Sequence, residues 1–148
     1  MSNAVEVGML KGRPYGGVMC LIHNDLRKFA KTMYTNERCA IVRLFNYIII
    51  NVYFPCAGTA DRQLICDDLL AEIDSLWQQF EMYETIIAGD FNTSLDSTDV
   101  VAQAINNFLT KRKLVRADGL FLTAKAPTYV NEALKRSSTI DYVVTTTP

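Results

Sequence analysis

An acidic residue and an amide residue, two positions apart, follow a short apolar run. Residues 86–88 lead into Gly89, and Asp90 and Asn92 come next. Side chains of an extended segment alternate between its two faces, so this spacing can aim both groups at one face. Gly89 lets backbone or ligand approach closely, a carboxylate can hold a metal-bound water or activate a nucleophile, and an amide can donate to a phosphate oxygen. These residues indicate phosphoester chemistry, and a Gly-Asp turn capped by the Asn stays open as the alternative.

Two further side chains suit the same chemistry. Tyr53 ends an apolar run just before Pro55, where its hydroxyl could bond a phosphate or simply reach a buried partner. Asp141 stands within the apolar run 139–145, and an acid there costs free energy unless it is paired. It could orient a catalytic histidine or bond backbone amides, and both readings stay open. His23 is the only histidine, and we expect it in a surface turn.

The elements that must position these groups follow from hydrophobic periodicity. Apolar, β-branched runs bounded by turn residues predict strands at residues 16–23, 38–44, 48–54, 85–88, 128–130 and 139–145. Apolar positions three and four apart predict helices at residues 61–80 and 98–109, the second capped by Ser97. The nearly continuous apolarity of residues 48–54 predicts a central strand buried on both faces. This order of elements predicts an α/β domain with a mixed sheet.

Length and composition limit the class of protein. The chain has 148 residues, which predicts a single domain over 1–148, and its 49% hydrophobic content excludes a disordered or fibrous chain. No apolar run approaches the roughly 20 residues of a membrane helix, so we expect no membrane partner. The four cysteines form no CxxC pair and no secretory leader is recognisable, so zinc knuckles and disulfides are not expected. We expect an intracellular protein, nuclear or cytoplasmic.

Charge is distributed unevenly along the chain. The net charge is −1, yet residues 101–148 carry seven basic and three acidic side chains, whereas residues 1–100 carry eight basic and thirteen acidic ones. A polyanion would be attracted to a face built from the C-terminal third and repelled by the acidic stretch 61–99. A solvated charged face without a ligand stays open as the alternative.

Four segments, taken in order, resemble a known superfamily. Residues 10–18, 51–55, 89–92 and 138–142 resemble the endonuclease/exonuclease/phosphatase (deoxyribonuclease-I-like) superfamily, and most closely the apurinic-type endonuclease domain of non-LTR (LINE-type) retrotransposons. The resemblance implies part of a four-layer α/β sandwich, with two packed mixed sheets flanked by helices. It also implies hydrolysis of DNA phosphodiesters with Mg²⁺ or Mn²⁺, and a reverse transcriptase domain as a partner on the same polypeptide.

The resemblance also assigns roles to single residues. By that likeness Tyr53 contacts phosphate, Asp90 holds the metal and positions or activates the attacking water, and Asn92 holds the scissile phosphate. Asp141 would orient a histidine, and Thr128 is a further phosphate contact. These five residues are the candidate catalytic and substrate-binding side chains of the chain.

The chain also departs from the family pattern. The metal-binding Glu of the family, with the Asn before it, lies well upstream of the Gly16–Val18 segment, and the family's histidine lies beyond Asp141. We therefore expect an incomplete domain with little or no turnover. Two alternatives stay open, a lipid or inositol phosphate phosphatase of the same superfamily and a catalytically dead domain that binds nucleic acid.

Overall fold

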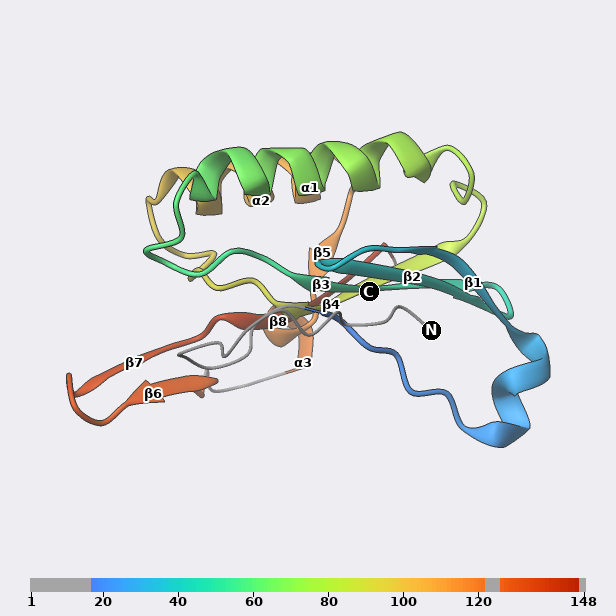
Figure 1. The fold of residues 1–148 in the computed structure, drawn as a ribbon, viewed down its shortest axis with the longest axis horizontal. Coiled ribbons are helices and arrows are strands. Elements are labelled where there is room, and N and C mark those ends of the chain that lie inside the picture. Colours follow the sequence, from blue (N-terminus) through green and yellow to red (C-terminus); the bar gives the residue numbers. More distant parts are fainter. Residues whose placement is uncertain (1–16, 122–125, 147–148) are drawn as a thin grey trace, which may run out of the picture.

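A mixed six-stranded sheet forms the centre of the molecule (Figure 1). The computed structural model describes residues 17–121 and 126–146. The strand order in the sheet is β1-β2-β3-β4-β8-β5. Its strands are β1 (Ala30–Thr35), β2 (Cys39–Leu44), β3 (Tyr47–Tyr53), β4 (Glu84–Asp90), β5 (Val115–Arg116) and β8 (Asp141–Thr145). Only β3 and β4 run parallel, so the predicted α/β class and mixed sheet are confirmed.

Helices and a small hairpin complete the fold. They are the short 3-10 helix η1 (Asn24–Phe29), the helices α1 (Arg62–Trp77), α2 (Val100–Lys111) and α3 (Asp118–Phe121), and the strands β6 (Tyr129–Asn131) and β7 (Arg136–Ser138). The β6–β7 hairpin extends away from the body of the protein, on the side opposite η1 (Figure 1). It forms a second, two-stranded sheet that is separate from the six-stranded one.

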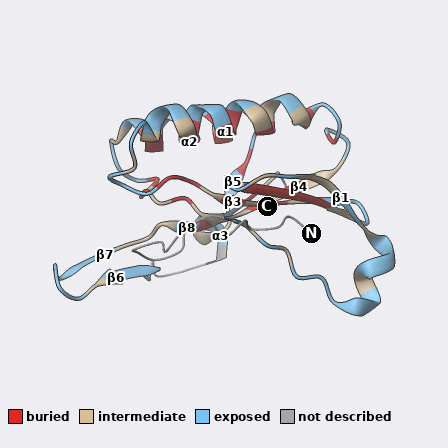
Figure 2. Cartoon of the chain, viewed as in Figure 1, coloured by how far each residue is buried: buried red, intermediate tan, exposed pale blue. Residues whose placement is uncertain are grey.

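The core lies between the main sheet and two helices. Both α1 and α2 lie over the same face of the sheet, and buried residues concentrate in that layer (Figure 2). The apolar stripe predicted for α1 is confirmed by the buried Leu69, Leu70, Ile73 and Trp77. The helix ends at Trp77, three residues earlier than predicted, because tight turns follow, in which the N–H of Phe80 donates to the Trp77 carbonyl oxygen.

The β2–β3 hairpin matches the expectation of two paired strands. Leu44 pairs with Tyr47, so Phe45 and Asn46 form a two-residue connection. As predicted, β3 is central, between β2 and β4. Burial on both faces is only partly confirmed, because Ile50 is fully buried whereas its neighbours in the sequence are intermediate.

Three sequence predictions differ from the structure. Within the predicted strand 16–23, the described residues 17–23 form no strand, because single hydrogen bonds to Glu37 and Asn51 replace a ladder. The edge strand β1 was not predicted, because Lys31 and its polar neighbours give it no apolar alternation. The predicted cap Ser97 is wrong: the N-cap of α2 is Asp99, and it makes no side-chain cap hydrogen bond.

The cysteines behave as small side chains, as expected. All four are free, and Cys39 and Cys66 are buried in the core. Burial raises the pKa of Cys39 and that of Cys66 to about 12, so both thiols stay protonated at neutral pH. Across the described part of the chain, no helix has the length and apolarity needed to cross a membrane.

Candidate functional site

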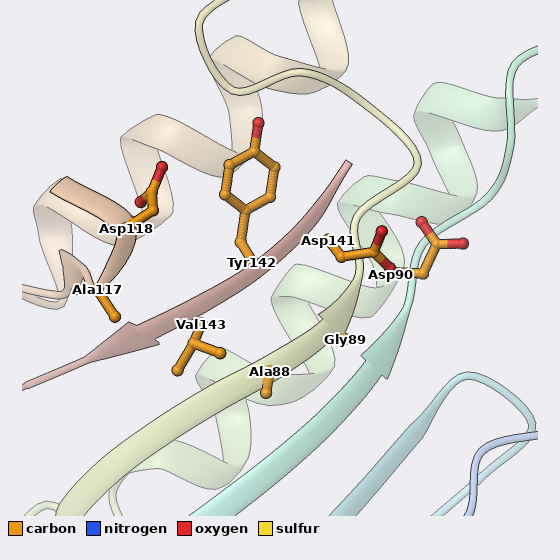
Figure 3. A pocket seen from close by; sticks show the side chains of 8 residues that line it. All are labelled: Ala88, Gly89, Asp90, Ala117, Asp118, Asp141, Tyr142 and Val143. Atoms are coloured by element: carbon orange, nitrogen blue, oxygen red, sulfur yellow. The ribbon is translucent and has the colours of Figure 1, made fainter. Parts of the chain in front are cut away.

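Three of the candidate residues form one row across adjacent strands. Tyr53 ends β3 and is in register with Asp90 at the end of β4, and Asp90 is in register with Asp141 at the start of β8. Directly paired residues of neighbouring strands project from the same face of a sheet. Figure 3 shows the carboxylates of Asp90 and Asp141 next to each other at the strand ends. The pairing therefore brings together side chains that are far apart in the sequence.

Gly89 allows β3 and β4 to come together at this row. Its φ of 148° is unfavourable for other residues, and an added Cβ would lie 2.0 Å from the carbonyl oxygen of Val52. The close approach expected at Gly89 is thus an approach of backbone. The glycine permits the close pairing of β3 and β4 that places Tyr53 beside Asp90.

Asn92 closes the loop after β4. Its backbone N–H donates to Oδ1 of Asp90 at 2.8 Å, and its Nδ2 donates to the carbonyl oxygen of Phe54 at 2.9 Å. The φ of Asn92 is 49°, a left-handed conformation that Asn tolerates better than most residues. The amide nitrogen predicted to donate to phosphate is thus engaged with backbone, and Asn92 orients the Asp90 carboxylate.

Arg62 at the start of α1 joins three segments around this loop. Its Nε donates to the Pro55 carbonyl oxygen at 3.1 Å, Nη2 donates to the Asn92 carbonyl oxygen at 3.0 Å, and Nη1 lies 2.8 Å from Oδ2 of Asp99. The side chain is only 18% exposed. Sequence reasoning missed Arg62, because its partners lie up to 37 residues away and a lone arginine at a helix start gives no local signal.

Thr128 lies just before β6 and contacts Asp141 of the row. Its Oγ1 accepts hydrogen bonds from the backbone N–H groups of Ile140 at 3.0 Å and Asp141 at 3.1 Å. Its own N–H donates to the Ser138 carbonyl oxygen. Thr128 therefore lies beside Asp141, and it holds the backbone at the start of β8.

Arg38 lies beside Tyr53 and was also missed from sequence. Its guanidinium carbon is 5.6 Å from the centroid of the Tyr53 ring, and Nη1 donates to the Tyr53 carbonyl oxygen at 3.4 Å. Its only ion-pair contact in the described part of the chain is a long one, 3.9 Å, to Glu37. A cation next to a phenol can stabilise an anion there.

A pocket adjoins the two carboxylates. It has a volume of about 520 Å³ and lies where β4, β8 and the start of α3 meet. Its lining includes the apolar side chains of Ala88, Ala117 and Val143 and the carboxylates of Asp90, Asp118 and Asp141 (Figure 3). Asp118 is engaged with Arg116, whose Nη2 lies 2.6 Å from Oδ2 of Asp118. The acidic groups nearest each other are therefore Asp90 and Asp141.

The surroundings of Asp90 shift the pKa of its carboxyl. Burial raises the pKa of its carboxyl above the usual range, and the negative charge of Asp141 adds to that rise. The hydrogen bonds from Asn92 act in the opposite direction without cancelling it. A carboxylate with a raised pKa binds a proton more readily, which suits general-base catalysis.

Three basic side chains of residues 101–148 form ion pairs with acidic residues of the stretch 61–99. Nζ of Lys111 lies 2.8 Å from Oδ2 of Asp74, and Nε of Arg112 donates to Oδ1 of the same residue at 2.7 Å. Arg116 lies 2.7 Å from Oδ1 of Asp96. The separation of charge along the sequence therefore does not carry over to these three cations, which pair with the acidic stretch.

The donor set limits how a metal could bind. No group of three or more His, Cys, Asp or Glu side chains able to hold a metal ion occurs within the described residues. Mg²⁺ commonly takes one or two carboxylates and completes its shell with water and substrate phosphates. Asp90 and Asp141 on adjacent strands fit that mode of binding.

Comparisons with known proteins identify the family of this chain. Curated protein sequences give no match. A family model described as endonuclease-reverse transcriptase matches residues 47–148, the part of the chain that contains all five candidate residues. The chain therefore belongs to the endonuclease-reverse transcriptase family, and it is an endonuclease-like domain of the retrotransposon type.

Proposed function

We propose that this domain hydrolyses phosphodiester bonds of DNA with the help of a divalent cation, Mg²⁺ or Mn²⁺. The observation that carries the proposal is the row of Tyr53, Asp90 and Asp141 at the ends of three adjacent strands, in which the two carboxylates line a pocket. Membership of an endonuclease family supports a nucleic acid as the substrate. The same family description supports a reverse transcriptase domain as the partner on one polypeptide.

The proposed reaction uses Asp90 as the base. A water oxygen attacks the phosphorus, Asp90 accepts the proton of that water, and the bond from phosphorus to the sugar oxygen breaks. The sugar oxygen leaves as an alkoxide and takes a proton from solvent water. Tyr53, with Arg38 beside it, would hold a phosphate oxygen from the neighbouring strand.

The cation would bind at the two carboxylates. Asp90 would be its main ligand, and Asp141 lies in register beside it. When bound, a divalent cation neutralises charge that develops on the phosphate. Since only two carboxylates meet here among the described residues, we propose that full activity needs ligands from outside those residues.

A plasmid-nicking assay tests the proposal. Purified chain is incubated with supercoiled plasmid in Mg²⁺, in Mn²⁺ and in EDTA, alongside Asp90→Asn and the control Asp61→Asn. Asp61 is an exposed acid with a φ of 55°, a conformation that Asn accepts equally well. Weak metal-dependent nicking that Asp90→Asn abolishes and Asp61→Asn keeps is the expected result, because the described residues supply only two carboxylates to the cation.

Two other outcomes identify the alternatives. Folded protein that binds DNA in a salt-dependent way, yet never nicks it with either metal, is a binding domain without catalysis. One of the two N–H groups on Nδ2 of Asn92 is already engaged with the Phe54 carbonyl oxygen, which leaves one for a phosphate. Release of phosphate from an inositol phosphate, without nicking, would identify the phosphatase.

A further inference from the structure

A patch of aromatic and basic residues lies at the end of the sheet opposite the candidate site. We call it the turn patch; it consists of Arg27, Lys28, Phe29, Lys31 and Phe45. It combines η1, the start of β1 and the β2–β3 turn, at the side of the molecule away from the β6–β7 hairpin (Figure 1). Since Phe45 precedes β3 and Tyr53 ends it, the length of the strand separates the patch from the carboxylates by roughly 20 Å.

Two aromatic rings are exposed in the turn patch. Phe29 is 44% exposed and Phe45 is 49% exposed, and their ring centroids lie 4.4 Å apart. Phe45 has a φ of 53° in a two-residue hairpin connection, where Asn and Gly are the favoured residues. The chain thus keeps a large aromatic side chain at a position where it costs backbone strain and is not needed for the core.

The cations of the turn patch differ from those of the C-terminal third. Nζ of Lys28 lies 4.9 Å from the centroid of the Phe29 ring. Arg27, Lys28 and Lys31 are all exposed, and no ion pair involves them in the part of the chain that the structure describes. The acid of η1, Asp25, lies against His23 instead.

A shallow hollow adjoins these cations. It has a volume of about 700 Å³ and is lined by Asn24, Asp25, Arg27 and Lys28. A surface that combines aromatic faces with a groove of positive charge is the arrangement by which proteins bind single-stranded nucleic acid. The bases stack on the rings, and the phosphates lie along the cations.

We propose that the turn patch binds single-stranded nucleic acid at a site separate from the candidate active site. Phe29 and Phe45 offer faces on which bases can stack, and Arg27, Lys28 and Lys31 offer charge to the backbone between them. The positive charge of the patch matches this ligand and not a basic or neutral peptide. The inference does not depend on the Asp90 site being catalytic, because the two sites share no residue.

Fluorescence anisotropy with two probes of equal charge tests the proposal. One probe is a labelled oligothymidylate, and the other is an abasic oligonucleotide of the same length. The full chain should prefer the oligothymidylate, and Phe45→Asn should lower its affinity for that probe roughly tenfold without weakening the abasic probe. The control Leu64→Gln removes an exposed apolar side chain from α1 and should change neither.

The choice of variants keeps the test independent of folding. Asn suits the left-handed turn position, so Phe45→Asn should unfold at the same temperature as the wild type or higher. Phe29→Leu is a second variant that keeps an apolar contact with Phe45 and removes a stacking surface. Replacing Arg27, Lys28 and Lys31 by Gln should reduce the slope of log affinity against log salt by about 2, since each contact contributes about 0.7.

Photo-crosslinking with an iododeoxyuridine oligonucleotide locates the site directly. Crosslinks on Phe29 or Phe45 are expected, and Asp90→Asn should leave them in place. The proposal is overturned if crosslinks map only to the strand ends near Asp90, or if Phe45→Asn and Phe29→Leu both keep the preference for oligothymidylate. Self-association through the patch, seen as a concentration-dependent dimer that Phe45→Asn dissolves, would also overturn it.

Discussion

The two faces of the main sheet carry different side chains on the same strands. On the face covered by α1 and α2, Ile48, Ile50 and Val52 of β3 are buried. On the other face, Asn51 and Tyr53 of the same strand are only partly buried. The alternation of a single strand thus separates the residues that stabilise the fold from those that can meet a substrate.

The same division continues across β4 and β8. Ile87 and Val144 are paired and buried, whereas Asp90 and Asp141 are paired on the face where Val143 is 45% exposed. The carboxylates of these two strands lie on the second face, because burial under the helices would leave them without water. Substitutions on the first face should therefore change stability, and those on the second should change chemistry.

The largest effect is expected at Gly89, where the backbones of β3 and β4 come close together. Gly89→Ala places a Cβ 2.0 Å from the Val52 carbonyl oxygen, at a φ of 148°. We expect a loss of about 4 kcal/mol in the free energy of unfolding, at the upper end for a single substitution. Urea denaturation followed by circular dichroism measures it.

Gly58→Ala is the matched control for this change. Gly58 also has a left-handed φ, 91°, yet an added Cβ would meet nothing within 4 Å. Backbone strain alone should cost about 1 kcal/mol. Equal losses for the two variants would show that the contact between Gly89 and Val52 does not limit the fold.

Ile49 and Ile50 are neighbours in β3 and lie on opposite faces of the sheet, so substituting each in turn compares the packing of the two faces. Ile50→Ala empties a fully buried site under the helices and should lower the free energy of unfolding by about 3 kcal/mol. Ile49→Ala removes a partly buried side chain from the other face and should cost about 1 kcal/mol. If the two losses measured by urea denaturation were equal, the second face would be as tightly packed as the first.

Arg62→Met tests what holds the loop of the site. Removing the guanidinium takes away the arginine hydrogen bonds to the carbonyl oxygens of Pro55 and Asn92 and to the carboxylate of Asp99, which keeps the Thr93 hydroxyl as a donor. We expect a cost of about 2 kcal/mol. Hydrogen exchange of the Asn92 amide should become faster, because the loop that carries it loosens. Arg62→Lys keeps the charge without the fork of donors, so full protection in that variant would show that charge alone suffices.

The smallest effect concerns the pH dependence of stability. The pKa of Asp90 is raised in the fold, mainly by burial, so its contribution to stability is complete below the pKa of the unfolded chain, about 4. That contribution is lost as the pH rises through the raised pKa. Asp90→Asn should therefore stabilise the protein slightly at pH 7, by less than about 1 kcal/mol because solvent screens a partly exposed group.

Thermal unfolding of Asp90→Asn from pH 3 to pH 8 checks this sign. The gain over the wild type should disappear at the acidic end of the range. A destabilised Asp90→Asn at pH 7 would mean that the Asp90 carboxylate stabilises the fold.

Asp99 should show the opposite dependence of stability on pH. Burial opposes its ionisation, but the hydrogen bond and charge of Arg62 leave the pKa of Asp99 lowered, so its contribution is lost as the pH falls.

The sequence by itself determined most of the elements that build the site. Local periodicity located β3, β4, β8 and both long helices to within a few residues, because alternation and helical spacing are read from neighbours in the chain. It failed for β1, an edge strand without an apolar face, and for residues 17–23, which no strand pairs with in the described chain. The resemblance to a nuclease family also came from sequence, and the family match supports it.

Only the tertiary structure decided how the candidate residues meet. The register of β3, β4 and β8 places Tyr53, Asp90 and Asp141 in one row, and register depends on strand pairing across the chain. The contact of Arg62 with Asn92 and the pairing of Arg112 with Asp74 could not be predicted either, because these partners lie 30 or more residues away in the sequence. Local spacing specifies strands and helices, whereas contacts between distant segments exist only after the core has packed.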